Sequence, residues 1–480
     1  MSAFADLLAL LWRATAATGS GERAADGAAG GQGPDGEAAE GAGSATGPRV
    51  VLPSAFDVTG LATGAIAAGL RAAAELVAAR AGAATPAVTV DSRDACADFA
   101  REGLFTPVDW EHPAIWDPIA GNYRTADGWI RLHTNYTWHR AVVERVLDAR
   151  GRDAVHAALA TRTGDEVETA VVAAGGAAAV MHDRAQWLAS AAGAATAGAR
   201  PISITERPAA SSAAPRWNGR SGAGLPLAGV RVLDLTRVIA GPTCTTFLGG
   251  YGADVLRIDP PGFDEVTSLL PVTTVGKRTA FLDLRESAGR AAFERLVADA
   301  DVLVTGLRSD ALAGLGYDDA ALGALNADLI HASLDAYGWE GPWRGRRGFD
   351  SLVQMSCGIA AAGAAAAGVD TPTPLPVQAL DHAAGWLLGA AIARALTRRL
   401  TDGTTARIHA SLIGTANLLY ELTAPAQAPA GLAEVGLEEV DTAWGPARGV
   451  PMPGRIDGVV PDWAPQAGPL GRHPARWNPR

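Results

Sequence analysis

Lysine is almost absent from this chain. The 480 residues contain forty Lys and Arg together, and Lys277 is the one lysine among them. An ammonium is compact and a guanidinium is planar, so a single lysine indicates a place where the compact cation is needed. Gly276-Lys277-Arg278-Thr279 precedes a strand-like run at 280–284. This setting predicts an anion clasp built from Lys277 and Arg278. The alternative is a surface turn with one chance lysine.

Cysteine is scarce, and neither cysteine nor histidine is spaced for metal binding. Cys96, Cys244 and Cys357 are widely separated and form no CxxC pair. This pattern excludes a disulfide framework and a cysteine-ligated zinc site, and it fits a reducing compartment. The nine histidines show no HExxH or similar spacing, so no metal is expected.

The chain also has no excess of positive charge, and it has no long apolar run near the first residue. The formal net charge of −11 argues against a nucleic acid or an anionic membrane as partner. An anionic ligand would therefore need a local basic pocket. The apolar stretch at 4–18 is interrupted by Arg13, is too short to span a membrane and follows no basic region. A cytoplasmic protein without membrane contact is expected.

Composition divides the chain into segments. At 480 residues it is too long for one compact core, so two or three domains are expected. Residues 1–48 are predicted to be a flexible N-terminal segment, because 19–48 contain almost no large apolar group. The proline-bearing segment 201–225 is predicted to be a linker. Many prolines and three tryptophans at 424–480 predict an extended tail that lies on another surface.

Strand and helix patterns alternate between residues 229 and 333. A buried-strand pattern at 230–235 precedes a helix that Gly241-Pro242 opens. The later units are strands at 254–258, 302–304 and 329–333 and helices at 287–299 and 318–325. This alternation predicts an α/β fold, with a parallel sheet covered by helices on both faces.

One arrangement of residues occurs twice. Leu52-Pro53, then Asp57, an alanine-rich helix to Arg80 and a strand at 87–90 form the first copy. Leu375-Pro376, then Asp381, a helix to about Arg398 and a strand at 406–410 form the second. The shared order predicts an internal duplication. The alternative is two unrelated alanine-rich helices.

Several ordered blocks resemble one enzyme family. They are 227–235 with Gly241-Pro242, 251–259, 276–278, 326–333, 341–350, and Asp381 followed by Gly385. These blocks resemble the family III CoA-transferases, a group that includes formyl-CoA and carnitine CoA-transferases and related acyl-CoA racemases. The resemblance implies a Rossmann-like CoA-binding large lobe at 226–423 and a smaller α+β lobe at 106–200. Segment 49–105 is then a partial repeat of the late part of the large lobe. The small lobe precedes the large one, in reverse of the family order, and a homodimer is implied.

The resemblance also implies the chemistry. Asp381 matches the family's nucleophile, which attacks an acyl-CoA thioester and forms an aspartyl intermediate before an acceptor carboxylate takes CoA. No permanently bound cofactor is required, and coenzyme A and its thioesters are substrates. The residues expected to contact CoA are Arg237, Val238, Ala240, Gly241, Pro242, Arg257, Lys277, Arg278 and Arg308. From its position alone, Asp381 could instead be a helix N-cap. Asp57 is either a second nucleophile or, as we expect, an N-cap relic.

Departures from the family pattern leave alternatives open. A CoA-transferase that uses a carboxylic acid acceptor is the leading hypothesis. The racemase branch has a histidine where this chain has Phe349, so the acid/base pair that a racemase or isomerase needs is incomplete. The reordered lobes also allow a non-catalytic CoA-binding homologue. The run Gly306–Asp310 keeps Arg308 but differs from the family's turn, and the family's small-lobe glycine loop is not evident.

Overall fold

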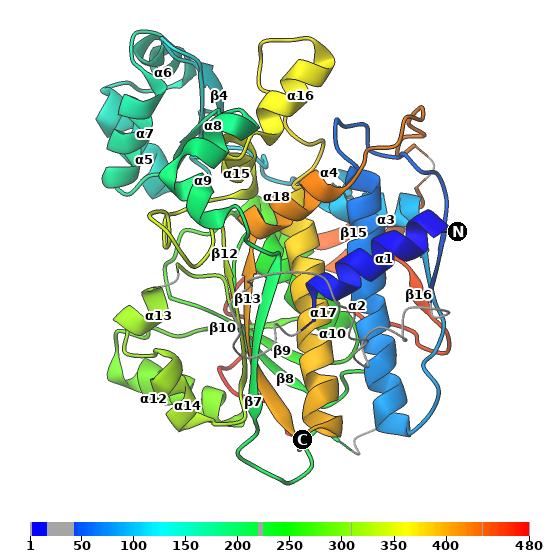
Figure 1. Cartoon of the computed structure of the whole chain (residues 1–480). Coiled ribbons are helices and arrows are strands. Elements are labelled where there is room, and N and C mark those ends of the chain that lie inside the picture. The colour runs from blue at the N-terminus through cyan, green and yellow to red at the C-terminus, as the bar shows by residue number, and fades with distance from the viewer. Residues whose placement is uncertain (1, 17–42, 219–223, 309, 434, 480) are drawn as a thin grey trace, which may run out of the picture.

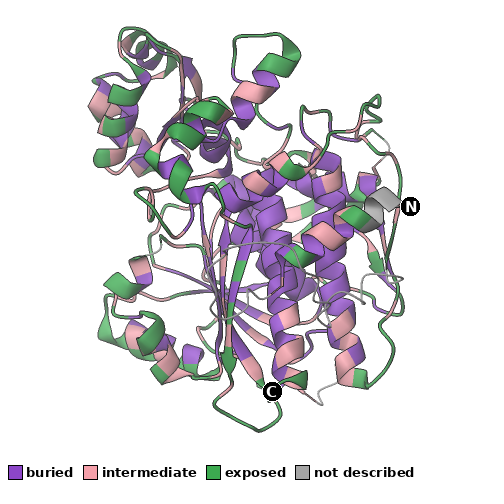
Figure 2. Ribbon diagram, viewed as in Figure 1, coloured by how far each residue is buried: buried purple, intermediate pink, exposed green. Residues whose placement is uncertain are grey.

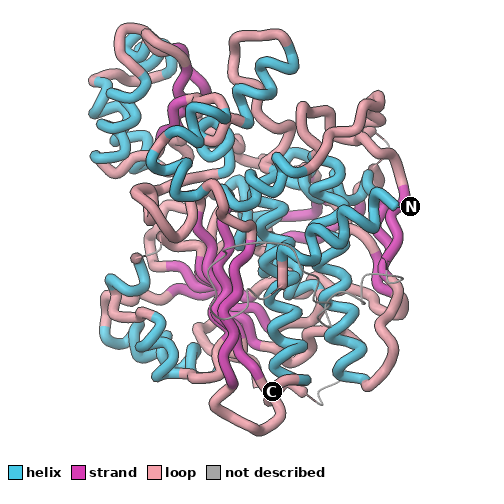
Figure 3. Tube along the Cα trace, in the orientation of Figure 1, coloured by secondary structure: helices cyan, strands magenta, loops and turns pink. Residues whose placement is uncertain are grey.

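A seven-stranded sheet lies at the centre of the protein (Figures 1 and 3). The computed structural model describes residues 2–16, 43–218, 224–308, 310–433 and 435–479. The strand order is β10-β9-β8-β11-β12-β13-β7, and all neighbours are parallel except β7, which is antiparallel to β13. The strands are β7 (Ile202–Pro208), β8 (Arg231–Leu235), β9 (Asp254–Asp259), β10 (Arg278–Phe281), β11 (Val302–Thr305), β12 (Ile330–Asp335) and β13 (Thr404–Ser411). The predicted mixed α/β fold with a parallel sheet is confirmed.

Helices cover both faces of this sheet (Figure 1). One face carries α10 (Ala240–Gly250), α17 (Ala379–Thr401), α2 (Val58–Ala81) and α1 (Ser2–Ala14). The other carries α12 (Ser287–Asp299), α13 (Ala311–Gly314) and α14 (Asp319–Leu325). The remaining large-lobe helices are a 3₁₀ turn at Thr267–Leu269, α11 (Leu270–Thr273), α15 (Asp350–Ser356), α16 (Ile359–Ala367) and α18 (Leu412–Glu421). Burial on both faces explains why the central strands are rich in Val, Leu and Ile (Figure 2).

Helices α2 and α17 pack against each other through small residues. Most residues of α2 are buried, and a Cβ placed on Gly69 would lie 2.7 Å from Cε3 of Trp386. By length and composition alone α2 could cross a membrane, but most of its apolar window is buried inside the protein. Small residues let the two helix backbones approach closely, and this contact joins the two predicted repeats.

Each predicted repeat forms a helix, a strand and a second helix. The first is α2, β2 (Val88–Asp91) and α3 (Ser92–Phe99), and the second is α17, β13 and α18. The residues that precede the two long helices have similar backbone dihedrals, with φ/ψ of −77°/68° at Asp57 and −76°/62° at Gln378. Only β13 joins the central sheet, because β2 pairs with β1 (Gly43–Thr46) and β16 (Arg455–Ile456).

The small lobe is an antiparallel sheet with helices on its outside (Figure 1). Its strands are β4 (Gly121–Arg124), β5 (Trp129–Leu132) and β6 (Ala178–Val180). Its helices are α5 (Thr137–Leu147), α6 (Arg152–Leu159), α7 (Gly164–Ala173), α8 (Arg184–Ala189) and α9 (Ala191–Thr196). This region has its own core, centred on Ile130, Leu132 and Val143.

Two segments expected to lack structure contain regular elements. In the segment predicted to be flexible, α1 packs on α2 and buries Leu11 and Trp12, and β1 pairs with β2. Residues 17–42 lie outside the described residues. In the predicted linker, 202–208 form edge strand β7, in which Ile202 and Ile204 are buried. Both predictions are wrong for these residues, because composition averaged over a long segment conceals short apolar patterns.

The last part of the chain lies along the large lobe. Strands β14 (Glu438–Thr442) and β15 (Gly445–Gly449) form a hairpin that pairs with β3 (Thr106–Pro107). Beyond it, the backbone N–H of His473 donates to the carbonyl of Thr279 at 2.8 Å. The guanidinium of Arg278 donates to the carbonyl of Arg476 at 2.8 Å. These contacts cover the β10 edge of the central sheet. A short helix, α4 (Arg101–Leu104), completes the described elements.

Candidate active site

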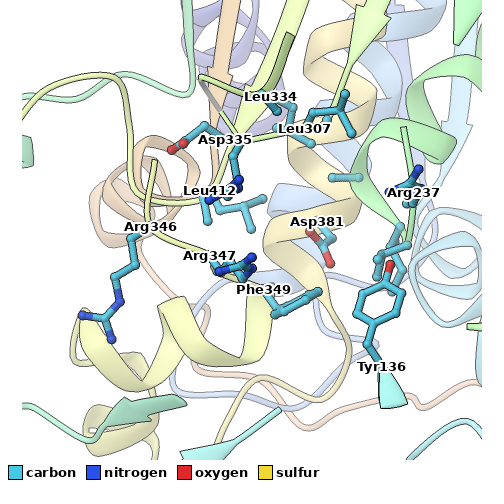
Figure 4. Close-up of a pocket in the computed structure, with 18 of the residues that line it drawn as sticks. Tyr136, Arg237, Leu307, Leu334, Asp335, Arg346, Arg347, Phe349, Asp381 and Leu412 are labelled. Atoms are coloured by element: carbon cyan, nitrogen blue, oxygen red, sulfur yellow. The ribbon is translucent and has the colours of Figure 1, made fainter. Parts of the chain in front are cut away.

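A cavity of about 380 Å³ lies between the large lobe and the small lobe (Figure 4). The small lobe and the segment before α5 supply aromatic side chains and a histidine. The large lobe supplies the loop before α10, the ends of β11 and β12, the loop before α15 and the first turn of α17. The lining residues used below are Tyr136, His139, Arg237, Val238, Ala240, Phe263, Leu307, Arg308, Asp335, Arg346, Arg347, Phe349 and Asp381.

Asp381 is the third residue of α17, and it does not cap this helix. Its carboxylate forms no hydrogen bond or ion pair with the residues that the structure describes, and it faces the cavity (Figure 4). The capping acceptor is Asp350 of α15, whose Oδ2 accepts from the backbone N–H of Leu380 at 2.8 Å and of Asp381 at 3.0 Å. The alternative assignment of Asp381 as an N-cap therefore fails. A second carboxylate satisfies the helix donors, and the Asp381 oxygens remain open to a ligand.

Burial and neighbouring charge make Asp381 an unusual carboxyl group. Desolvation, together with Asp350 and Glu102, raises the pKa of Asp381 well above its usual range. Burial also raises the pKa of Asp350, but backbone N–H groups and the Gln354 amide donate to that carboxylate and favour its ionised form. Asp350 thus holds the negative charge more readily than Asp381 does.

The partial repeat contributes a buried ion pair next to this site. Nε2 of His382 lies 3.1 Å from Oε2 of Glu102 on α4, and the imidazole stacks on Phe99 with centroids 5.2 Å apart. Burial opposes protonation of His382, yet Glu102 raises its pKa overall. The next turn is held by Trp386, whose indole N–H donates to Asp98 at 2.8 Å. Segment 49–105 therefore helps to fix the first turns of α17.

The loop before α10 forms one wall of the cavity. Val238 has φ +68°, a left-handed conformation that β-branched residues avoid, and it lines the cavity together with Ala240. Such strain persists only where the surrounding structure holds it, and it clusters at functional sites. Gly241 and Pro242 follow in the first turn of α10 and lie behind the wall; a Cβ on Gly241 would lie 2.3 Å from Cβ of Thr236.

Two of the predicted cations lie at the cavity. The guanidinium of Arg237 stacks over the Phe263 ring at 3.5 Å and lies 3.3 Å from Oδ1 of Asp259. Arg308 also lines the cavity, at an exposed position.

Three predicted ligand contacts, Lys277, Arg257 and Arg278, do not reach the cavity. Lys277 is fully buried, and its Nζ lies 3.4 Å from Asp234 and 3.0 Å from the carbonyl oxygen of Pro242. Burial lowers the pKa of Lys277 to about 8, although the negative charge of Asp234 acts to raise it. The anion-clasp prediction is wrong, because Lys277 instead supports the first turn of α10 from inside.

The two arginines are equally engaged elsewhere. Arg257 is buried and pairs with Asp259 at 2.8 Å and Glu265 at 2.5 Å. Arg278 pairs with Asp254 at 2.8 Å and contacts the C-terminal segment. Arg257 is thus held by carboxylates two and eight residues along the chain, and Arg278 by a carboxylate on the neighbouring strand β9.

Asp57, which the sequence pattern pairs with Asp381, is the N-cap of α2 and so occupies the position that Gln378 has in the second repeat. Its Oδ1 accepts from the backbone N–H of Gly60 at 2.7 Å, so its carboxylate is committed to α2. This geometry agrees with an N-cap and leaves Asp381 as the open carboxylate of the pair.

The structure adds residues that had no assigned role. Asp335, at the end of β12, lines the cavity, and burial raises its pKa to about 7. His139 also lines the cavity, but both of its ring nitrogens are covered and unpartnered, and burial lowers its pKa to about 4. Phe349 lies flat on His133, with centroids 3.6 Å apart. The block at 341–350 pointed to Phe349 and Asp350, but nothing in the sequence placed Asp335 or His139 here.

A second hollow continues from the cavity. It has a volume of about 430 Å³ and lies over the ends of β8 and β9 and the segment after β10. The two spaces share Arg237, Phe263 and Leu307, whereas Asp381 lines only the inner cavity. An elongated ligand could therefore extend from the open carboxylate, past Arg237, to the carboxyl ends of the parallel strands.

This arrangement places a buried carboxylate beside a ligand-sized cavity that arginines line. Residues 227–448 match the family described as CoA-transferase family III. An acetyl-coenzyme A transferase, nodX, of Hypoxylon pulicicidum is 30% identical over 241 residues, which are 48% of this chain and 41% of that protein. A succinyl-CoA–L-malate CoA-transferase beta subunit of Chloroflexus aurantiacus is 35% identical, covering 39% of this chain and 49% of that protein.

A third curated relative and one solved structure are also similar to parts of this chain. A succinate–glutarate CoA-transferase of Agrobacterium fabrum is 32% identical, over 39% of this chain and 51% of that protein. The crystal structure of the hypothetical protein Rv3272 of Mycobacterium tuberculosis has 30% identity and a TM-score of 0.38, over 41% of this chain and 57% of that one. The chain spans about half the length, or less, of the curated relatives it matches.

The match to CoA-transferase family III thus covers residues 227–448, a little under half of the chain. The resemblance seen in the sequence blocks is thereby confirmed.

Proposed function

We propose that this protein transfers CoA between an acyl-CoA and a free carboxylic acid, with Asp381 as the nucleophile. The observation that supports this proposal best is the Asp381 carboxylate itself. It lies at a helix N-terminus, is poorly solvated, is free of hydrogen bonds from the described residues and faces a ligand-sized cavity. Because Asp350 serves as the cap, the carboxylate of Asp381 is available for attack on a thioester.

The proposed reaction balances without a metal, ATP or a redox step. The Asp381 carboxylate attacks the thioester carbonyl, and the C–S bond breaks to give a mixed anhydride and CoA thiolate. The thiolate attacks the aspartyl carbonyl, which releases the donor carboxylate and leaves an aspartyl-CoA thioester. The acceptor carboxylate then attacks the aspartyl carbonyl, and the C–S bond breaks to give a second mixed anhydride and CoA thiolate. The thiolate attacks the acceptor's acyl carbon in this anhydride. A new thioester leaves, and the Asp381 carboxylate is regenerated.

Coenzyme A would occupy both connected spaces. Its thioester end would lie in the inner cavity, next to Asp381 and the strained loop at Val238. Its nucleotide end would lie in the outer hollow, and Arg237 at the junction is a suitable phosphate contact. Arg308 lines the inner cavity but not the outer hollow. We also propose that the protein acts as a homodimer in the cytoplasm, which light scattering and fractionation would test.

The decisive experiment is covalent trapping. The full chain would be incubated with a panel of acyl-CoAs, treated with hydroxylamine or borohydride, and analysed by peptide mass spectrometry. Modification of the Asp381 peptide is expected, and it should disappear in Asp381→Asn while persisting in Asp57→Asn. Modification at Asp57, or at neither aspartate, would contradict the proposal.

Two alternatives make different predictions in the same experiment. A racemase would exchange the α-proton of an acyl-CoA in deuterated water, but Phe349 has no titratable group and both ring nitrogens of His139 are covered, so neither supplies a base. A non-catalytic homologue would bind CoA without any labelling of Asp381. The racemase alternative therefore predicts α-proton exchange without a covalent adduct on Asp381. The non-catalytic alternative predicts neither exchange nor an adduct.

A further inference from the structure

The arginines around the inner cavity divide into two kinds. Four arginines line it. Arg237 pairs with Asp259, and Arg346 pairs with Glu168 at 2.9 Å and lies 3.7 Å from the Trp343 ring centroid. In Figure 4, Arg346 extends away from the Asp381 carboxylate. By contrast, the guanidinium groups of Arg308 and Arg347 form no hydrogen bond or ion pair with any residue in the described ranges. These two guanidiniums are available to a ligand.

Arg347 is the deeper of the two. It is half-buried, whereas Arg308 is exposed at the rim. Burial and the nearby charge of Arg308 lower the pKa of Arg347, although Asp310 acts in the opposite direction without forming an ion pair. An arginine remains charged in proteins, so Arg347 carries an uncompensated cation into a partly desolvated space. An anion bound beside it would remove this penalty.

The position of Arg347 indicates which part of the ligand it meets. It lines the inner cavity together with Asp381 but not the outer hollow. Its Nη1 lies against the turn after α7, 3.7 Å from where a Cβ of Gly175 would be. The charge of Arg347 also helps to lower the pKa of His139, although burial is the larger cause. Arg347 therefore faces the small lobe, on the side of the thioester away from the nucleotide.

We propose that Arg347, assisted by Arg308, binds a second carboxylate on the acyl group or the acceptor, so that the substrates are short dicarboxylic acids and their CoA thioesters. This inference rests on the proposed CoA-transferase function. One carboxyl carbon reacts at Asp381, and the other carboxylate stays ionised and accepts paired hydrogen bonds from the planar guanidinium. The steps at Asp381 are unchanged, and no further reactant is needed.

The test uses two thioesters that differ in one group. Succinyl-CoA and butyryl-CoA both carry a four-carbon acyl chain, and only the first ends in a carboxylate. The rate of Asp381 labelling would be measured with each thioester in the unmodified chain and in Arg347→Met, Arg347→Lys and Arg344→Met. Arg344 is exposed on the same loop and does not line the cavity, so it is the matched control.

The expected result is a selective loss. The unmodified chain should label faster with succinyl-CoA, and Arg347→Met should reduce that preference by about ten- to a hundredfold, the range for a lost charge-assisted hydrogen bond. Arg347→Lys should restore part of the preference, and Arg344→Met should leave it unchanged. Equal loss with both thioesters, accompanied by weaker binding of CoA alone, would assign Arg347 to a phosphate and overturn the proposal. An unchanged preference would overturn it as well.

Calorimetric titration with succinate and with butyrate separates this inference from the proposed function. Succinate should bind the unmodified chain more tightly than butyrate does, and Arg347→Met should remove the difference. If no thioester labels Asp381 but this binding pattern holds, the transferase proposal fails and the dicarboxylate site stands. If Asp381 is labelled without any preference for the dicarboxylate in either assay, the transferase proposal stands and the role of Arg347 is wrong.

Discussion

Replacing Lys277 with methionine tests whether the single lysine serves a ligand or the fold. In the structure Lys277 is buried, with Nζ 3.4 Å from Oδ2 of Asp234. Asp234 also accepts from Oγ1 of Thr236 and of Thr245, both at 2.6 Å. Removing one partner of a buried ion pair typically costs about 3–5 kcal/mol of folding free energy. Because the two threonines still satisfy Asp234, we expect the lower end, about 3 kcal/mol.

The assay is urea unfolding of Lys277→Met followed by circular dichroism. The control is Arg285→Met, which removes a fully exposed cation paired with Asp283 and should not measurably change stability. CoA binding at low temperature, where Lys277→Met is still folded, should weaken only modestly, because Lys277 contacts the first turn of α10 through the Pro242 carbonyl and does not line the ligand space.

One outcome would refute this reasoning. If Lys277→Met unfolds at the same urea concentration as the unmodified chain but binds CoA at least tenfold more weakly, Lys277 contacts the ligand and the buried geometry is wrong.

The pH dependence of stability offers a second check. The pKa of Lys277 is lowered to about 8 in the fold, below its unfolded value. Above pH 8 the unfolded chain therefore binds more protons, and stability should rise with pH up to about 10 in the unmodified chain relative to Lys277→Met.

Three further predictions follow from particular contacts. Asp350→Asn should shift the acid limb of the pH–rate profile for Asp381 labelling to lower pH. The substitution removes a negative charge that raises the pKa of Asp381, while the amide oxygen still accepts from the helix N–H groups. An unshifted acid limb would contradict this assignment. Gly69→Ala should destabilise the protein by about 1–3 kcal/mol, because its Cβ would lie 2.7 Å from an indole ring carbon of Trp386 on α17. Gly103→Ala is the control and should not destabilise it, because a Cβ there would meet nothing within 4 Å. Equal melting temperatures of the two variants would refute the close packing. Leu11→Ala should cost about 2–5 kcal/mol in urea unfolding, because Leu11 is fully buried, and no change would mean that α1 is not part of the core.

Local patterns predicted the central sheet well. The apolar runs at 230–235 and 302–304 and the Gly241-Pro242 helix start correspond to β8, β11 and α10. These elements depend on periodicity and turn chemistry over a few residues, so they can be read from neighbours in the chain. Strand β7 was missed, because prolines at both of its ends favoured a linker although Ile202 and Ile204 alternate as a buried face requires.

The candidate site could be predicted only in part. The ordered blocks located Asp381 and the loop before α10, and the structure places both at one cavity. The blocks also predicted that Lys277, Arg257 and Arg278 contact a ligand, whereas Asp234, Asp259 and Asp254 occupy them. Whether a cation is free depends on the folded positions of carboxylates, which lie on another strand for Lys277 and Arg278 and on the same strand for Arg257, and sequence spacing alone does not give these distances.

By itself, the sequence determined which segments form buried strands and helices, and which residues could supply a carboxylate and cations. These properties follow from local hydrophobic period and side-chain type. Tertiary structure alone decided the roles. It brought Asp350 to the start of α17, where it caps the helix and leaves the Asp381 carboxylate free, and it paired Lys277 with Asp234 in the core. It also left the Arg347 guanidinium beside the cavity with no partner among the described residues. The reactivity and charge of a side chain depend on desolvation and on neighbours within a few ångströms, and only the folded chain sets those distances.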